Sequence, residues 1–248
     1  AADCYNIQFH ADVISTNRVI GNMDLGYDDL TLIRLLGKSV PLIVTHQKTP
    51  WKSVREMIED SRAHPGQVKI GNTGPSGLSG IISSMLAANF NMVPFKSEGE
   101  IVAALLGEHI DVASVSPAAC AEHVRSGRLR VLAVVDAGRL QTHPDWPALG
   151  EEMPEYNKYL PWGPLYGVFV KKGTPDDVVK RLREAFAAAA AAPQFKEYLK
   201  ANEILPVDTN VEETMKYLRD FTSKTSWLLY ESGAAKKSPA DFNIPKPR

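Results

Sequence analysis

The chain has 248 residues, of which 44% are hydrophobic and 23% charged, and its formal net charge is −1. This length and composition describe a globular protein that can bury a core, as one large domain or as two lobes. The near-zero charge argues against a nucleic-acid-binding protein, which needs a basic surface stripe. No apolar run reaches the length of a membrane span. Cys4 and Cys120 lie far apart in sequence, and we expect two buried free thiols rather than a disulfide.

Strands and helices alternate along the first half of the sequence, which favours parallel sheets joined by crossover helices. We expect strands at 4–9, 42–45, 67–70, 92–95, 110–114 and 129–135. We expect helices between Ser53 and Pro65, at 79–90, at 98–106 and between Ser116 and Gly127. Residues able to cap a helix, Ser53 and Ser116, mark two of these starts.

Residues 136–164 are rich in proline, which breaks any long element. After a strand at 166–170, Thr174 is expected to cap a helix in which Pro175 takes the first position. The remaining expected elements are a helix at 194–201, a strand at 204–207, a helix at 211–232 and a loose tail at 236–248.

The stretch from Gly71 to Gly80 lies between the expected strand 67–70 and an apolar helical pattern. A strand that leads through a Gly- and Ser-rich loop into a helix leaves several backbone N–H groups unpaired at the positive end of the helix dipole. Such a loop can bind a carboxylate or a phosphate. The same pattern also occurs in turns that serve packing alone, so the loop by itself leaves both interpretations open.

Several further motifs follow one another along the chain. They are Asp3–Tyr5, Tyr27–Leu30 followed by Val40–Val44, Gly71–Gly80, Val93–Lys96 followed by Leu106, Gly107 and Asp111, Ser126–Val135, Pro147, Trp162–Gly163, and Gly167–Phe169 before Gly173–Pro175. In order and spacing this set resembles the solute receptors of tripartite tricarboxylate transporters, the Bug family of extracytoplasmic binding proteins. The resemblance runs from Asp3 to about Gly233.

This resemblance implies an α/β fold of the two-lobed periplasmic binding protein type (type II), with a ligand cleft between the lobes. One lobe would combine residues 1–46 with 168–248, and the other would be 47–167. The protein would bind a small organic acid, a carboxylate, and hand it to a membrane permease, with no cofactor, no metal and no enzymatic activity. The resemblance also implies a periplasmic location, although the sequence shows no signal peptide.

The sequence departs from the family pattern in two places. Family members begin with a strand and a Pro-Gly-Gly loop before the segment that Asp3–Tyr5 resembles, and this sequence starts at Ala1 without them, either as a fragment or part of a longer chain or as a shortened relative. A first lobe without that strand would be less stable or would bury the gap against a second copy, which predicts self-association. In the loop, Gly80 stands where a histidine is usual and Leu78 replaces a small polar residue, which leaves the ligand class open.

The resemblance assigns ligand contacts to one loop above all. Its residues are Asn72, Thr73, Gly74, Ser76 and Gly77. The hydroxyls of Thr73 and Ser76, together with backbone N–H groups, would hold a carboxylate. The alternative is an ordinary capped turn.

A second loop, Lys96–Glu100, corresponds to a Gly-rich loop of the family at another helix start. Ser97 and the Gly99 N–H would reach the ligand there. Glu98 and Glu100 are also explained as favourable first-turn carboxylates, and their charge would oppose a dianionic ligand.

Ser114 and Ser116 lie where a strand ends and a helix begins, and open α/β folds bind ligands at the carboxyl ends of strands. A capping role alone would also explain Ser116. His10 and Ala11 follow the first expected strand and would be what remains of the first lobe's ligand wall. His10 with Asp12 also suggests a catalytic or metal site, but without a third partner we expect a solvent-facing turn.

The leading hypothesis is therefore a solute receptor for a small carboxylate. The first alternative is an enzyme that reuses the cleft, such as a hydrolase acting on a carboxylate ester. The sequence contains no Gly-x-Ser-x-Gly nucleophile elbow, which such hydrolases carry. The second alternative is an interaction module whose incomplete lobe favours self-association.

Overall fold

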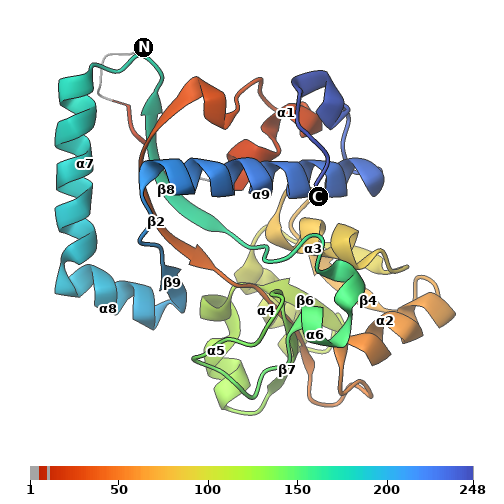
Figure 1. Ribbon diagram of the computed structural model, residues 1–248. Coiled ribbons are helices and arrows are strands. Elements are labelled where there is room, and N and C mark those ends of the chain that lie inside the picture. The colour runs from red at the N-terminus through yellow and green to blue at the C-terminus, as the bar shows by residue number, and fades with distance from the viewer. Residues whose placement is uncertain (1–5, 10–11, 248) are drawn as a thin grey trace. The chain divides into compact units, whose positions relative to one another are not determined.

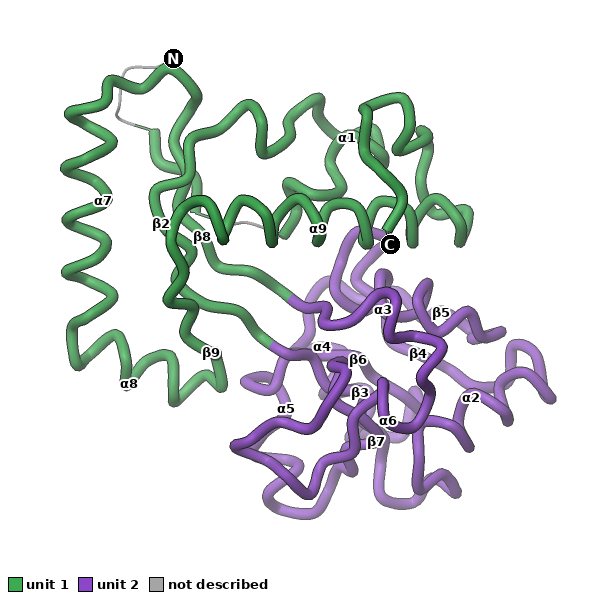
Figure 2. Tube along the Cα trace, viewed as in Figure 1, with its two compact units in different colours: residues 1–39, 164–248 green, residues 40–163 purple. Residues whose placement is uncertain are grey.

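The computed structural model describes residues 6–9 and 12–247. The chain folds into two compact units, one made of residues 1–39 and 164–248 and the other of residues 40–163 (Figure 2). From the sequence we expected the chain to pass into the second lobe after residue 46 and back into the first at residue 168. In the structure it passes into the second unit after residue 39 and back into the first at residue 164. The reason is strand pairing: β3 (Leu42–His46) hydrogen-bonds within the second unit, and β8 (Leu165–Lys171) hydrogen-bonds within the first.

The first unit is built on a four-stranded sheet with the order β1-β8-β2-β9, in which every pairing is antiparallel (Figure 1). Its strands are β1 (Gln8–Phe9), β2 (Leu30–Ser39), β8 and β9 (Ile204–Pro206). Its helices are α1 (Asn17–Ile20), α7 (Asp176–Ala191), α8 (Pro193–Ala201) and α9 (Val211–Glu231), with 3-10 turns at Asp12–Ser15, Tyr27–Asp29 and Pro239–Phe242. Both α7 and α9 contact β2.

The core of the first unit joins its sheet to α7. Ile33 and Leu36 of β2 and Val168 and Val170 of β8 pack against Val179, and other apolar residues of α7 cover this cluster. Burying each such side chain contributes roughly 1.5–3 kcal/mol. The ten-residue strand β2 is central to this unit, and the sequence analysis did not predict it.

The second unit is built on a five-stranded sheet with the order β5-β4-β6-β3-β7. Besides β3, its strands are β4 (Lys69–Asn72), β5 (Asn91–Pro94), β6 (Val112–Val115) and β7 (Leu129–Val134). Its helices are α2 (Val54–Ala63), α3 (Leu78–Leu86), α4 (Glu98–Leu106), α5 (Pro117–Arg125) and α6 (Leu149–Glu152), with a 3-10 turn at Pro154–Tyr156.

The expectation of parallel sheets is confirmed only for part of the second unit's sheet. In the second unit, β4 runs parallel to both β5 and β6, as crossover helices require, but β3 runs antiparallel to β6 and β7. In the first unit the described strands pair only in antiparallel fashion. Strand pairing between distant segments set these directions, and the order of elements along the chain does not reveal it.

Of the three expected helix caps, Ser53, Ser116 and Thr174, only Ser53 caps its helix through its side chain. Ser53 accepts a hydrogen bond from the Glu56 N–H at 3.1 Å at the start of α2. The start of α7 differs, because Pro175 precedes the helix and the Thr174 hydroxyl donates to the Lys171 carbonyl at 2.7 Å instead of capping. None of the helices in the described ranges is both long and apolar enough to cross a lipid bilayer.

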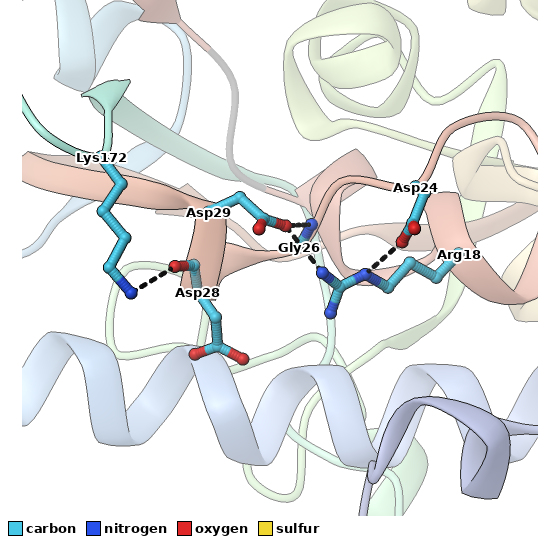
Figure 3. Close-up of polar contacts among 6 residues, drawn as sticks. All are labelled: Arg18, Asp24, Gly26, Asp28, Asp29 and Lys172. Carbon is cyan, nitrogen blue, oxygen red and sulfur yellow. Dashed lines mark hydrogen bonds and ion pairs between the residues drawn. The ribbon is translucent and has the colours of Figure 1, made fainter.

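The turn that leads into β2 is fixed by charged side chains (Figure 3). The Arg18 guanidinium donates to Asp24 at 3.0 Å and to Asp29 at 2.7 Å. The same Asp29 carboxylate accepts from the Gly26 N–H at 2.8 Å, and Lys172 donates to the Asp28 carbonyl at 3.1 Å. These bonds hold the 3-10 turn at the point where the long strand begins.

The C-terminal tail is ordered against α9, contrary to the expectation of a loose segment. The Trp227 indole N–H donates to the Ile244 carbonyl at 3.1 Å, and the Ser223 hydroxyl donates to the Pro245 carbonyl at 2.6 Å. The Lys246 ammonium lies 4.8 Å from the centre of the Trp227 ring. Side-chain donors on α9 satisfy the tail's carbonyl groups, which explains why a proline-containing segment is held in place.

Candidate functional site

Three helices begin along one edge of the sheet in the second unit. Because β5, β4 and β6 are parallel neighbours, their carboxyl ends lie at the same edge. The helices α3, α4 and α5 start after these strands, at Leu78, Glu98 and Pro117. We call this place, made of residues 72–80, 95–99 and 114–117, the three-helix edge. At each helix start the helix dipole places partial positive charge, which favours an anion wherever no carboxylate already compensates it.

The loop before α3 satisfies most of its own backbone donors. The Gly74 N–H donates to the Asn72 side-chain oxygen at 2.7 Å, and the Thr73 N–H donates to the Ser79 hydroxyl at 3.0 Å. The Gly77 N–H donates to the Gly74 carbonyl at 3.1 Å. These N–H groups are therefore engaged within the loop, although the sequence analysis expected them to face a ligand.

The backbone N–H groups without a partner lie after the loop, in the first turn of α3. Within the residues that the structure describes, the N–H groups of Leu78, Ser79 and Gly80 have no hydrogen-bond partner. The Ser76 hydroxyl is likewise unpartnered there, whereas the Thr73 hydroxyl lies 3.3 Å from that of Ser79. The first turn of α3 contains no acidic residue, so its positive end is uncompensated. The turn therefore has the charge and the unpaired donors that an anion site needs, although Ser79 and Gly80 are themselves buried.

Gly80 is required by the path of the loop. A Cβ atom built at residue 80 would lie 2.1 Å from the Gly74 carbonyl oxygen and 2.9 Å from the Cα of Pro75. The loop therefore folds directly over the first turn of α3, and only glycine fits below it. The departure from the family's usual histidine has this steric explanation.

The edge carries one carboxylate of its own. Glu98 Oε2 accepts from the Ser116 N–H at 3.0 Å and from the Ser116 hydroxyl at 2.6 Å. Glu98 thus links the first turn of α4 to the start of α5. Ser116 does not cap α5 through its side chain, and because its hydroxyl proton is donated to Glu98 it is not available for a ligand carboxylate. Glu98 was recognisable from the sequence as a first-turn carboxylate, but its contact with Ser116 was not.

The cysteine next to this carboxylate is chemically inert. Burial raises the pKa of the Cys120 thiol to about 12, and the negative charge of Glu98 contributes to the same shift. The thiol is free and buried, and it lies 3.7 Å from the Ser116 carbonyl oxygen. A thiol with this pKa is protonated at neutral pH and cannot serve as a nucleophile. Cys4 lies outside the described residues.

The other expected site residues fall into three groups. Ser97 caps α4 by accepting from the Glu100 N–H at 3.3 Å, and Gly99 is exposed in the first turn. Ser114 is fully buried in β6, where its hydroxyl has no partner among the described residues. His10 and Ala11 lie outside the described residues. No cluster of three or more metal-ligating side chains occurs in the part of the chain that the structure describes.

Comparisons with known proteins identify the family to which the chain belongs. The model of a family described as the tripartite tricarboxylate transporter family receptor matches residues 1–233. The chain belongs to this receptor family. The resemblance described from sequence motifs is thereby confirmed. A family of receptors favours the receptor hypothesis over the hydrolase alternative.

Relatives and solved structures agree with this membership. BugT of Bordetella pertussis is 26% identical over 215 residues, which cover 85% of this chain and 65% of that protein. The structure of the periplasmic binding protein BugD superposes with a TM-score of 0.78 at 22% identity, covering 96% of this chain and 81% of that one. MatC from Rhodopseudomonas palustris with bound malate gives a TM-score of 0.75 at 18% identity, covering 92% and 80%. These matches confirm the fold of the family's periplasmic binding proteins.

The chain spans 63–66% of the length of the curated relatives that it matches first, which are UPF0065 proteins and BugT.

Proposed function

We propose that this receptor-family protein captures a small organic acid in the periplasm through the three-helix edge and delivers it to a membrane permease. The observation that carries the proposal is the convergence of three helix starts on one edge, with the N–H groups of Leu78, Ser79 and Gly80 unpartnered within the described chain. The solved relative MatC, whose structure contains malate, supports an acid as ligand.

The chemistry of the edge supports binding rather than catalysis. Cys120, which lies in α5 next to the edge, is protonated at neutral pH, and the Ser116 hydroxyl donates to Glu98. Binding would rely on backbone donors and helix dipoles, which orient a carboxylate without reacting with it.

A calorimetric titration of the purified protein with a panel of small acids tests this function. The panel contains monocarboxylates, dicarboxylates, tricarboxylates and amino acids. We expect at least one acid to bind and to raise the melting temperature in proportion to its occupancy. A panel in which no acid binds at millimolar concentration would contradict the proposal.

Self-association remains a prediction, and one feature of the first unit supports it. In the described sheet β1 is an edge strand, and Phe9 is 52% exposed while Ile7 beside it is 44% exposed. An exposed apolar edge strand can pair with the same strand of a second copy. Sedimentation velocity over a range of concentrations tests this: a dimer that Phe9→Lys disrupts is expected, and a monomer at every concentration would contradict it.

A further inference from the structure

Glu98 is anchored at the three-helix edge through one oxygen only. Its Oε2 accepts both the N–H and the hydroxyl of Ser116, while its Oε1 has no hydrogen-bond partner in the described chain. Two bonds to one neighbour fix the position of the carboxylate, and the free oxygen can accept a hydrogen bond from a ligand.

No basic side chain neutralises this carboxylate. Among the described residues, no lysine, arginine or histidine lies within ion-pair distance of Glu98. Lys96 precedes the helix and is exposed, and its backbone N–H donates to Glu100 at 2.9 Å. Glu98 therefore presents an unpaired negative charge at the edge.

The three helix starts are consequently not equivalent. At α5 the Glu98 carboxylate already occupies the place of an anion, and α4 carries Glu98 and Glu100 in its own first turn. Only α3 has an uncompensated positive end, with the free N–H groups of Leu78, Ser79 and Gly80. The edge thus offers one position that attracts a carboxylate and one that repels a second carboxylate.

We propose that Glu98 is a specificity-determining residue that makes this site select a carboxylate ligand that also carries an ammonium group, as an amino acid does, over a dicarboxylate. The inference rests on the proposed function, since it assumes that the acid binds at the three-helix edge. The ligand carboxylate binds the start of α3, and its ammonium group donates to Glu98 Oε1. A dianion of the same length brings two carboxylates together and binds more weakly.

Matched ligand pairs test the selectivity by calorimetry. Each pair joins a dicarboxylate to the ω-amino acid with the same number of carbons, such as succinate with 4-aminobutanoate and glutarate with 5-aminopentanoate. The α-amino acids of the panel are titrated in parallel. For the unmodified protein we expect the amino-bearing ligand to bind at least about tenfold more tightly than its dicarboxylate, since charge-assisted hydrogen bonding replaces charge repulsion.

Two substitutions assign the effect to Glu98. Glu98→Gln keeps an oxygen that can accept from Ser116 but removes the charge, and we expect the preference to fall about tenfold, mainly because dicarboxylates bind more tightly. Glu100→Gln removes a carboxylate from the same helix turn, where its bond is to the Lys96 N–H, and we expect the preference to change by less than about twofold.

The outcomes separate the two proposals. If dicarboxylates bind the unmodified protein as tightly as their amino partners, or if the bound acid lacks a cationic group, the inference about Glu98 is wrong while the receptor function stands. If no acid of either series or of the wider panel binds, the receptor function itself is wrong. The ratio of the affinities of the unmodified protein for the amino-bearing ligand and for its matched dicarboxylate tests the selectivity even if Glu98→Gln fails to fold.

Discussion

At residue 80 the absence of a side chain allows the ligand loop to lie over the start of α3. A methyl group there would meet the Gly74 carbonyl oxygen, which would lie 2.1 Å from the new Cβ. Gly80→Ala is expected to displace the loop, to cost about 1–3 kcal/mol of unfolding free energy and to weaken acid binding at least about tenfold. Urea denaturation and calorimetry measure the two effects.

The matched control is Gly99→Ala, also in the first turn of a helix. Its nearest neighbour would lie 3.9 Å from the new Cβ, so the unfolding free energy should stay within about 0.5 kcal/mol or rise slightly. Equal stability of the two variants would show that the loop does not depend on close contact at residue 80.

The buried thiol of Cys120 makes the unfolding free energy depend on pH, and the direction follows from its raised pKa. Its pKa rises from an ordinary value of 9.0 to about 12, first because of burial and then because of Glu98. Between these values the unfolded chain loses the thiol proton before the folded chain does, so the folded state binds more protons. The stabilising contribution is complete below pH 9 and is lost as the pH rises toward 12.

We therefore expect the unfolding free energy to fall more steeply with pH above 9 in the natural protein than in Cys120→Ala. Comparing the two isolates the thiol from tyrosines and lysines that titrate in the same range. Native Cys120 should also resist alkylation at pH 8, where it is protonated and buried. Parallel pH profiles and fast alkylation would contradict the assignment.

Among the elements, α9 and the C-terminal tail form a unit held by side-chain hydrogen bonds. Trp227→Phe keeps an aromatic ring but removes the N–H that donates to the Ile244 carbonyl, and we expect a loss of about 1 kcal/mol of unfolding free energy. Tyr230→Phe is the matched control, because Tyr230 is exposed and its ring contact with Trp227 needs no hydroxyl. Proteolysis of the tail should accelerate in the first variant only, and equal rates would show that the tail does not depend on this bond.

Local signals predicted the helices of the second unit well and its sheet less well. The capping residue Ser53 predicted the start of α2, and α4 was predicted with the bounds that the structure shows, whereas the expected cap Ser116 does not bond to α5. Strand direction depends on partners far away in sequence, so the reversal of β3 was not predictable. The strand β2 was missed because its buried residues do not alternate with exposed ones: Leu35, Leu36 and Gly37 are buried in succession.

In the candidate site too, features that depend on one short segment were predictable and contacts between distant segments were not. Glycines and hydroxyl residues before an apolar helix predicted a loop at 71–77, and the structure places it at 73–77, after β4. This prediction was possible because the signal is contained in one segment. The contact between Glu98 and Ser116 spans two helices and could not be predicted from spacing. Which N–H groups remain free also depends on the folded loop, since Asn72 and Ser79 satisfy those that the sequence suggested.

For the whole molecule, the central claim is that an acid binds where α3, α4 and α5 begin. The most direct test is an amide NMR titration of the isotope-labelled protein with an acid that binds by calorimetry. If an acid binds there, the largest chemical-shift changes are expected at the N–H groups of Leu78, Ser79 and Gly80, with further changes at 97–99. A cavity in the first unit is lined by Ile14, Arg18 and Thr222, among others. Saturation with the ligand that leaves the amides of 78–80 unchanged while amides around that cavity shift would contradict this placement.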